Sequence, residues 1–359
     1  MKKNFKIHDK YIGEDYPCFI IAEAGVNHNG SLDKALELVD IAKSSGADAV
    51  KFQTFKAENL NLPNAPKSNY HIETTGNDKK QTWYELLKTQ ELTYEMHLKI
   101  FDHCKKNEII FLSTPYDIVS AELLLDVGVK AFKIASSDTN NIPFLSFLAN
   151  KNLPIILSSA MSTMAEVSDS INTIKNLGCD KLALLQCTGN YPSKLDDSNL
   201  NVINTYKKNF ECIVGYSDHT IENINPVAAT AMGAKIYEKH FTIDKNLPGP
   251  DHRMSLNFQE LKKTIDIIRD TEKALGSFEK KVLDSEKDNR KKLRKSIVTK
   301  RNLKKGETIK KDDISIKRPG FGIPPKYFND VIGSQALVDI DNNTSLTFEM
   351  INKSIQKEN

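Results

Sequence analysis

The stretch Ile213–Asp251, which reads IVGYSDHT…AKIYEKHFTIDKNLPGPD, contains the pattern that decides the fold. Two short apolar segments, Ile213–Tyr216 and Ala234–Tyr237, flank the Ala-rich segment Asn225–Gly233, which has the length and composition of a helix closed by a C-terminal glycine. A strand, a helix and a strand in this order form a βαβ unit, whose two strands are parallel and in most cases adjacent. The stretch therefore predicts two neighbouring parallel strands.

Each predicted strand leads into a histidine, His219 after the first and His240 at the end of the second. Adjacent parallel strands place these imidazoles at the same end of the sheet, where two neutral imidazoles can share one divalent metal ion. A lone histidine at a strand end is more often a structural residue bonded to the backbone. Asp218 beside the first histidine and the polar loop Pro248–Asp251 after the second favour the metal-binding interpretation.

The alternation of strand and helix patterns extends outward over most of the chain. Eight strand patterns are each followed by a helix pattern, and the pairs are Phe19–Val26 with Leu32–Ser45, Ala49–Phe55 with Thr93–Lys106, Ile109–Pro115 with Ile118–Val127, Ala131–Ala135 with Ile142–Ala149, Pro154–Ser158 with Thr163–Leu177, Leu182–Cys187 with Ser198–Lys208, Ile213–Tyr216 with Asn225–Gly233, and Ala234–Phe241 with Phe258–Leu275. Eight βα units without a G-x-G-x-x-G fingerprint favour an α/β TIM (β/α)8 barrel, whose closed sheet leaves no edge strand. A doubly wound open sheet is the alternative architecture.

The composition of the 359 residues is typical of a soluble globular protein, with 39% hydrophobic and 27% charged residues. The 50 basic and 47 acidic residues leave a formal charge of +3, which does not suggest nucleic acid as a partner. No window approaches the roughly 20 apolar residues of a membrane span, and the first residues lack the apolar run of a signal peptide, so we expect a cytoplasmic protein without membrane contact. Five scattered cysteines without C-x-x-C spacing argue against a disulfide framework and a structural zinc site.

Two lysines mark the expected site at the carboxyl ends of the barrel strands. Lys51 and Lys133 stand in the otherwise apolar segments AVKFQTF and AFKIASS, where side-chain alternation points both of them into the barrel. A buried lysine is costly unless it is paired or bound to an anion. Two such lysines near Ser and Thr hydroxyls predict a phosphate or carboxylate pocket. The alternative is that each lysine pairs with a barrel carboxylate such as Glu23.

Long, ordered motifs carry a resemblance to a known family. FIIAEAGVNHNGSLDKA, GADAVKFQTFKAENL, FLSTPYD, FKIASSDTNN, ILSSAMST, QCTGNYP, GYSDHT and EKHFTIDKNLPGPDHRMSL together resemble the sialic acid synthase family, which comprises N-acetylneuraminate synthase and its legionaminate and pseudaminate relatives. The resemblance covers nearly the whole chain. It implies a TIM barrel that condenses phosphoenolpyruvate with an N-acetylated mannosamine-type sugar to a nine-carbon 2-keto acid, with phosphate released by C–O cleavage.

The resemblance also implies a divalent metal and an acceptor sugar. The metal is expected to be Mn²⁺, with Co²⁺ or Mg²⁺ as alternatives. N-acetylmannosamine is the predicted acceptor, which would make the chain an N-acetylneuraminate synthase. A 2,4-diacetamido-2,4,6-trideoxyhexose, the acceptor of legionaminate and pseudaminate synthases, is the alternative.

Site roles follow from the resemblance position by position. The family's metal ligands are matched by His219 and His240. Its phosphoenolpyruvate-binding residues are matched by Lys51, Thr114, Lys133, Ser136, Ser158 and Ser217. Its sugar-binding residues are matched by Glu23, Gln53, Tyr191 and Asp251. Asp138 matches a carboxylate that orients or deprotonates the attacking water, but it stands where many bacterial members have Glu. Its side chain is one methylene shorter, so Glu23 and Asp138 both stay candidates for the base.

A charged segment separates the barrel from a second domain. We expect the barrel in residues 1–276, a linker in residues 277–294 that includes the Lys-rich stretch, and a small, mostly β domain in residues 295–359. This last part resembles the antifreeze-like, or SAF, domain that ends the family. Within it, KRPGFGIPP holds Arg318, which on sequence alone is a solvated residue. The resemblance instead implies that this arginine contacts the sugar's N-acetyl group in the partner subunit of a domain-swapped homodimer.

Two other interpretations stay open beside the synthase. A non-catalytic sugar- or phosphate-binding protein would be expected to lack one of the histidines or lysines, and all of them are present. A 3-deoxy-heptulosonate or octulosonate phosphate synthase would share the barrel but would not explain the C-terminal domain.

The polar excursion Lys56–Leu92 is predicted to border the sugar pocket, because long loops at a catalytic face are usually functional; the alternative is a disordered insertion.

Overall fold

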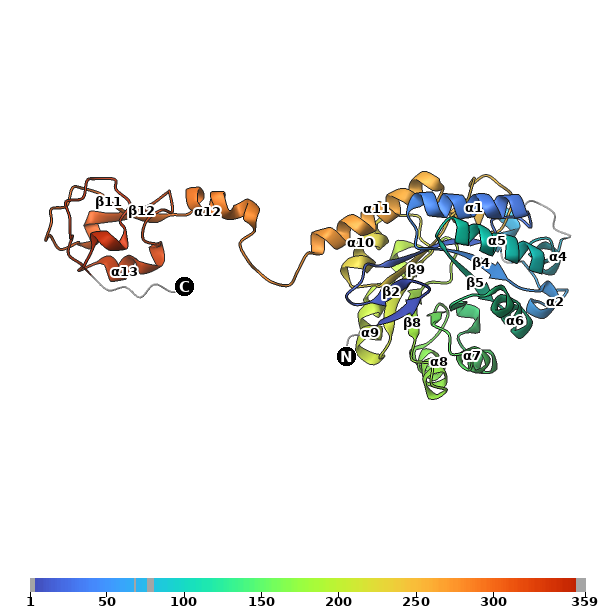
Figure 1. Cartoon of the computed structure of the whole chain (residues 1–359). Helices are drawn as coiled ribbons and strands as arrows, with labels where there is room; N and C mark the ends of the chain where they lie inside the picture. Colours follow the sequence, from blue (N-terminus) through green and yellow to red (C-terminus); the bar gives the residue numbers. More distant parts are fainter. Residues whose placement is uncertain (1–3, 68, 76–80, 353–359) are drawn as a thin grey trace. The chain divides into compact units, whose positions relative to one another are not determined.

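The computed structural model describes residues 4–67, 69–75 and 81–352. The chain divides into two compact units, Met1–Gly276 and Ser277–Asn359, which are drawn with their elements labelled in Figure 1.

The first unit is built on an eight-stranded parallel sheet. Its strands are β3 (Phe19–Gly25), β4 (Ala49–Thr54), β5 (Ile110–Pro115), β6 (Phe132–Ile134), β7 (Ile155–Ser158), β8 (Leu182–Cys187), β9 (Ile213–Asp218) and β10 (Ile236–His240). Their order is β5-β4-β3-β10-β9-β8-β7-β6, and β5 and β6 also lie beside each other, so the sheet curls into a nearly closed barrel. The predicted TIM barrel is confirmed, and the open, doubly wound alternative is wrong.

Helices follow the strands and surround the barrel (Figure 1). They are α1 (Leu32–Ser45), α5 (Tyr94–Lys106), α6 (Ile118–Val127), α7 (Ile142–Ala149), α8 (Met164–Asn176), α9 (Asn201–Asn209), α10 (Ile224–Ala231) and α11 (Phe258–Leu275). In α1 the Ser31 side chain caps the first turn by accepting from the Lys34 amide, and Gly46 ends the helix at φ +89°. Leu38 and Val39 are fully buried against the strands. No helix in the described ranges is long and apolar enough to cross a membrane.

An N-terminal hairpin closes the amino end of the barrel. Strands β1 (Asn4–Ile7) and β2 (Lys10–Gly13) pair antiparallel. Phe5, Ile7 and Ile12 pack in one cluster with inward-facing residues of the barrel strands, such as Ile21 and Leu112. Because this end is filled with apolar side chains, polar chemistry is left to the carboxyl ends of the strands.

The second unit has a small apolar core of its own, which contains Ile297, Ile314 and Leu346. Its regular elements are α12 (Lys287–Leu293), β11 (Ser296–Thr299), β12 (Ile314–Lys317) and α13 (Phe328–Val331), with β11 antiparallel to β12. The short helix α12 lies inside the stretch expected to be an irregular linker. Its residues are all exposed, and a 2.8 Å ion pair between Asp288 and Lys292 links successive turns. Such a helix has no apolar periodicity, which is the signal that sequence analysis uses.

Candidate functional site

A pocket opens at the carboxyl ends of the barrel strands. All eight strands or the residues that follow them contribute to its lining, which comprises Glu23, Lys51, Gln53, Thr114, Tyr116, Lys133, Ala135, Ser136, Ser137, Ser158, Ala160, Met161, Cys187, Gly189, Tyr191, Ser217, His219, Glu238 and His240. Eleven residues predicted for the site are among them. The structure therefore brings together most of the side chains that the sequence motifs single out.

The two predicted lysines are buried at this pocket and face carboxylates. Lys51 Nζ lies 2.8 Å from Glu23 Oε2 and 3.8 Å from Glu238 Oε2, and it donates to Thr114 Oγ1 at 3.0 Å. Lys133 Nζ lies 3.3 Å from Glu238 Oε1. The pairing of a lysine with Glu23, which the sequence left as an alternative, is thus present for Lys51. Two lysines and two carboxylates form one buried cluster of opposite charges.

Glu238 is the member of this cluster that the sequence reasoning missed. It bridges Lys51 and Lys133, and it accepts a hydrogen bond of 3.0 Å from the Ser217 hydroxyl. The signal was present in the sequence, because side chains alternate along a strand and Glu238 stands two residues before His240 in β10. An inward His240 therefore requires an inward Glu238.

The four charged groups respond differently to burial. Burial raises the pKa of Glu23 to about 7, although the charge of Lys51 opposes the rise. Burial would also raise the pKa of Glu238, but Lys133 and Lys51 together hold it below its usual value. Burial lowers the pKa of Lys133, whereas Glu23 and Glu238 outweigh burial at Lys51 and raise its pKa. Of the two carboxylates, Glu23 is the one that can exchange a proton near neutral pH.

Hydroxyl groups surround the lysines in a way that suits an anion. The Ser158 hydroxyl is buried and has no hydrogen-bond partner within the described part of the chain. Ser136 Oγ accepts from the Ala160 amide at 2.9 Å, which leaves its proton available as a donor. Thr114 accepts from Lys51 and in the same way keeps its proton. Lysine ammonium groups and unsatisfied hydroxyl donors are the groups that bind phosphate and carboxylate oxygens.

The two histidines lie side by side, as predicted. The register pairs Asp218 with Lys239, so the next residues, His219 and His240, are neighbours, and their ring centroids are 5.5 Å apart. His219 Nδ1 donates to the Thr188 carbonyl oxygen at 2.7 Å, so in the neutral imidazole Nε2 has the lone pair. Burial lowers the pKa of His219, but Cys187 and the Thr188 carbonyl oxygen outweigh burial and raise this pKa. Burial, followed by the charges of His219 and Lys51, lowers the pKa of His240 far below its usual value.

These histidines fit a divalent metal ion in the chemistry of their donor atoms. His240 Nδ1 is buried without a hydrogen-bond partner among the described residues, and its imidazole is neutral at physiological pH. No group of three or more His, Cys, Asp or Glu side chains within residues 4–67, 69–75 and 81–352 is arranged to hold a metal. The coordination of a metal ion bound by the two imidazoles would therefore be completed by oxygen ligands from water or a substrate.

The residues predicted to bind the sugar gather around Gly25. This glycine has φ +55°, and a Cβ there would lie 3.4 Å from Asp251 Oδ2, 3.4 Å from Gln53 Nε2 and 3.5 Å from Glu23 Oε1. Asp251 is also 3.8 Å from His240 Nδ1, and burial raises the pKa of Asp251 to about 6. The Tyr191 ring lies 4.2 Å from the ring of His219. Acidic, amide and aromatic groups thus adjoin the histidine pair.

Two predicted residues lie elsewhere. Asp138 does not line the pocket; its carboxylate accepts hydrogen bonds from Asn141 at 2.9 Å and Ser137 at 3.4 Å, and burial raises its pKa. Arg318 is exposed in the second unit. Their catalytic and sugar-binding roles stay predictions.

The excursion Lys56–Leu92 contains the short helices α2 (Ala57–Leu60), α3 (Asn69–Thr74) and α4 (Trp83–Lys88). Thr74 contacts the loop before Asp251, because its carbonyl oxygen accepts from the Gly249 amide and its hydroxyl donates to the Pro250 carbonyl, each at 3.5 Å. The part of the excursion around Gly76 lies outside the described residues. The described part borders the predicted sugar contacts through Thr74.

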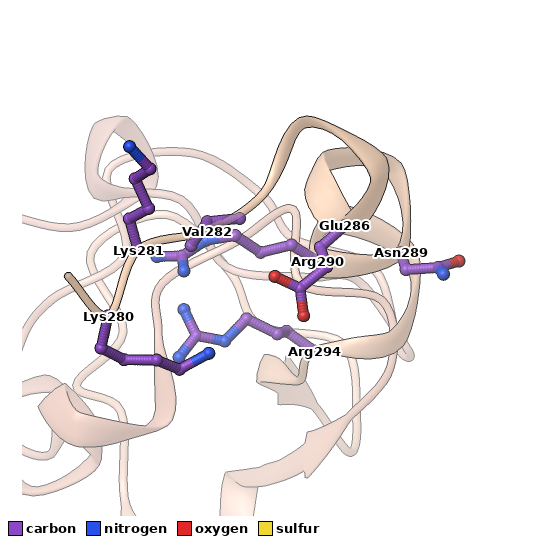
Figure 2. Close-up of a pocket in the computed structure, with 7 residues that line it drawn as sticks. All are labelled: Lys280, Lys281, Val282, Glu286, Asn289, Arg290 and Arg294. Atoms are coloured by element: carbon purple, nitrogen blue, oxygen red, sulfur yellow. The ribbon is translucent and has the colours of Figure 1, made fainter. Parts of the chain in front are cut away.

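Figure 2 shows a second hollow, formed within the second unit by exposed side chains. It is lined by Lys280, Lys281, Val282, Glu286, Asn289, Arg290 and Arg294. None of these residues was predicted for the site. An exposed, mostly basic cluster is typical of a solvated surface, which agrees with the interpretation of this Lys-rich stretch as solvated.

The barrel and its pocket define the class of protein. A TIM barrel that presents buried lysines, two adjacent imidazoles and a carboxyl group with a pKa near neutrality at its catalytic end is an enzyme built to act on an anionic substrate. The comparisons with known proteins agree with this class and narrow it.

The chain belongs to the NeuB family, whose model matches residues 38–280, and the SAF domain model matches residues 294–352. It is 44% identical to the N,N'-diacetyllegionaminic acid synthase of Legionella pneumophila over 98% of this chain and 99% of that protein. It is 35% identical to a pseudaminic acid synthase of Campylobacter jejuni over 91% and 94% of the two chains. The crystal structure of an N-acetylneuraminic acid (sialic acid) synthetase from Leptospira borgpetersenii matches 80% of this chain and 95% of that chain, with 33% identity and a TM-score of 0.71. These findings confirm the resemblance and the predicted enzyme class, a phosphoenolpyruvate-dependent synthase.

Proposed function

We propose that this enzyme condenses phosphoenolpyruvate with the open-chain form of an N-acetylated mannosamine-type sugar, to give a nine-carbon 2-keto acid and phosphate. The observation that supports this most is the placement of Lys51 and Lys133 beside His219 and His240 in one buried pocket. Lysines for an anion next to imidazoles for a metal are what a reaction between a phosphorylated enol and an aldehyde needs.

In this proposal, the phosphate and carboxylate of phosphoenolpyruvate are held by two lysines and four hydroxyl groups, namely Lys51, Lys133, Thr114, Ser136, Ser158 and Ser217. Both lysines are buried, so their charges act through a medium of low dielectric constant, where they stabilise the negative charge of the departing phosphate more strongly than in water. The unpartnered Ser158 hydroxyl supports this assignment, because a buried donor is expected to have an acceptor in the functional complex.

His219 and His240 would hold the divalent ion, which we propose to be Mn²⁺, with Co²⁺ or Mg²⁺ as alternatives. When bound, the ion supplies Lewis-acid polarisation of the sugar's aldehyde oxygen. Glu23, Gln53, Tyr191 and Asp251 surround the space beside the two histidines and orient the sugar.

Glu23 is the proposed proton acceptor. Carbon 3 of phosphoenolpyruvate forms a bond to the aldehyde carbon, whose oxygen takes up a proton. Water adds to carbon 2 and loses one proton to Glu23, which balances the proton taken up by the aldehyde oxygen. The bond between carbon 2 and the phosphate oxygen then breaks, the second proton of that water leaves with the phosphate, and the ketone remains. Glu23 lines the pocket and has a pKa of about 7, which suits a general base at neutral pH. Asp138 is the alternative base.

We further propose a domain-swapped homodimer in the cytoplasm, in which Arg318 of each chain contacts the N-acetyl group of the sugar in the partner's barrel. The family membership of both units supports this assignment. The guanidinium group has donors that suit the acetyl carbonyl oxygen.

The acceptor is either N-acetylmannosamine, which the sequence motifs predict, or a 2,4-diacetamido-2,4,6-trideoxyhexose. The 44% identity with the Legionella enzyme favours the second candidate as much as the motifs favour the first. Phosphate release from phosphoenolpyruvate should be measured with Mn²⁺ and each sugar in turn, including N-acetylmannosamine 6-phosphate. Release with one sugar that EDTA abolishes supports the proposal and names the acceptor. Turnover that persists in EDTA argues against the metal, and silence with every sugar argues against these acceptors.

A further inference from the structure

A buried ion pair lies on the outer face of the barrel, directly behind the two histidines. Lys239 Nζ is 2.9 Å from Asp218 Oδ2, and the side chains are 5% and 0% exposed. The two residues are also register partners of β9 and β10. Neither of them lines the catalytic pocket, and the proposed reaction assigns them no step.

The hydrogen bonds of this pair bind together the two short segments that contain the histidines. Asp218 Oδ1 accepts from the Thr220 amide at 2.9 Å and from the Thr220 hydroxyl at 2.8 Å. Asp218 Oδ2 accepts from Lys239 and from the Tyr237 hydroxyl, and Lys239 also donates to the Thr220 carbonyl oxygen. The residues on both sides of His219 are therefore bonded to the residue that precedes His240.

Side-chain alternation explains why the pair is outside and the histidines inside. Tyr216 and Tyr237 pack in the layer between the strands and the helices, whereas Ile213 and Ile236 pack inside the barrel. Asp218 and Lys239 continue the outer series. Their contact fixes the ends of β9 and β10 relative to each other, and with them the separation and direction of the two inward imidazoles.

We propose that Asp218 and Lys239 are positioning residues, which hold His219 and His240 at the separation that a divalent ion requires. The inference rests on the proposed metal-dependent function. A buried ion pair often adds little stability compared with apolar side chains of similar size, so stability alone is a weak reason for one at this place. Preorganised ligands, by contrast, bind a metal more tightly than ligands that must be ordered first.

The test measures Mn²⁺ binding to metal-free protein, by the loss of the free-ion EPR signal during a titration, without substrate or turnover. Asp218→Asn and Lys239→Met should each weaken binding, with Kd raised by roughly tenfold to a hundredfold, the range seen when groups that orient metal ligands are removed. His240→Gln, which removes a proposed ligand, should lose binding altogether. Arg269→Met is the matched control, because it breaks a 3.0 Å ion pair with Asp48 in the same barrel, away from the pocket.

The outcomes separate positioning from general stabilisation. The proposal is supported if Asp218→Asn, Lys239→Met and Arg269→Met all lower Tm, but only Asp218→Asn and Lys239→Met raise the Kd for Mn²⁺. An unchanged Kd in those two variants overturns it and leaves the proposed function intact. If they do not fold, Tyr237→Phe removes a single hydroxyl from Asp218; a raised Kd then supports positioning and an unchanged Kd overturns it. Wild-type protein that binds no Mn²⁺ overturns both the inference and the metal-dependent function.

Discussion

Lys51 Nζ lies 2.8 Å from Glu23 Oε2, and both side chains are almost completely buried, with 4% and 2% of their surface exposed. The lysine proposed to bind the phosphorylated substrate therefore contacts the carboxyl group proposed to accept a proton. Because burial raises the pKa of Glu23 to about 7, both of its protonation states are populated near neutral pH. The proposed roles therefore predict that substrate binding and proton transfer are coupled at this contact.

The pH dependence of turnover should report Glu23. A base must be ionised to act, so the rate should fall as the pH drops below about 7, the pKa that burial gives Glu23. Glu23→Gln should lower kcat by about a hundredfold or more and remove this limb of the profile. Phosphate release measured between pH 5.5 and 8.5 is the readout.

Asp138→Asn is the comparison for the base assignment. Asp138 bonds to Asn141 and does not line the pocket, so its removal should leave the acidic limb in place. If the limb persists in Glu23→Gln and disappears in Asp138→Asn, the base is Asp138.

Lys133→Met should weaken phosphoenolpyruvate binding. The substitution removes a charged donor from the pocket, which should raise KM for phosphoenolpyruvate by between about tenfold and a hundredfold. It also leaves Glu238 with one lysine partner where it had two, so Tm should fall. Lys130→Met, which removes an exposed lysine three residues earlier, should change neither quantity. Equal KM values for the two variants would contradict the anion-binding role of Lys133.

Gly25→Ala should affect the sugar selectively. The new methyl group would be in van der Waals contact with Asp251 and Gln53 at 3.4 Å and with Glu23 at 3.5 Å, and it would occupy space beside them, so KM for the sugar should rise more than KM for phosphoenolpyruvate. The positive φ should also cost about 1 kcal/mol of stability. Gly46→Ala, at φ +89° after α1, carries the same kind of strain away from the pocket and should lower Tm without changing either KM. A sugar KM that is equally unchanged in both variants would remove the sugar site from this position.

Arg318→Ala tests whether the second unit completes a barrel in trans. The variant should have a raised sugar KM and a lowered kcat, and unchanged values would rule out the role. Mixed dimers of Arg318→Ala and His240→Gln chains should then regain about a quarter of wild-type activity, because random pairing of chains in two-fold dimers gives half mixed dimers with one intact site each. No recovery in verified mixed dimers would mean that Arg318 acts on its own barrel.

Much of the barrel could be predicted because its strands and helices have distinct periods. Leu32–Ser45 and Leu182–Cys187 were predicted with the bounds that the structure gives them. The inward direction of Lys51 and Lys133 followed from alternation alone. The same alternation places Glu238 inward, two residues before His240, but the prediction for this strand considered only the histidine.

Other features depend on contacts that no local pattern encodes. Asp138 turns toward Asn141, an orientation set by the turn that follows β6. The pairing of Lys51 with Glu23 depends on the register of β3 and β4, which places the two residues opposite each other. Helix α12 is exposed and is held by ion pairs such as Asp288–Lys292 and by a 2.9 Å hydrogen bond from the Gly320 amide to the Lys291 carbonyl oxygen, so hydrophobic periodicity could not reveal it.

The hairpin of β1 and β2 closes the amino end of the barrel. Substrates therefore reach the pocket from the carboxyl ends of the strands. Gln53 stands one pleat nearer than Lys51 to the carboxyl end of the same strand. A molecule held at Lys51 would therefore lie deeper in the pocket than one held at Gln53, and we expect the deeper molecule to bind first. With the roles proposed above, this geometry predicts an ordered reaction in which phosphoenolpyruvate binds before the sugar.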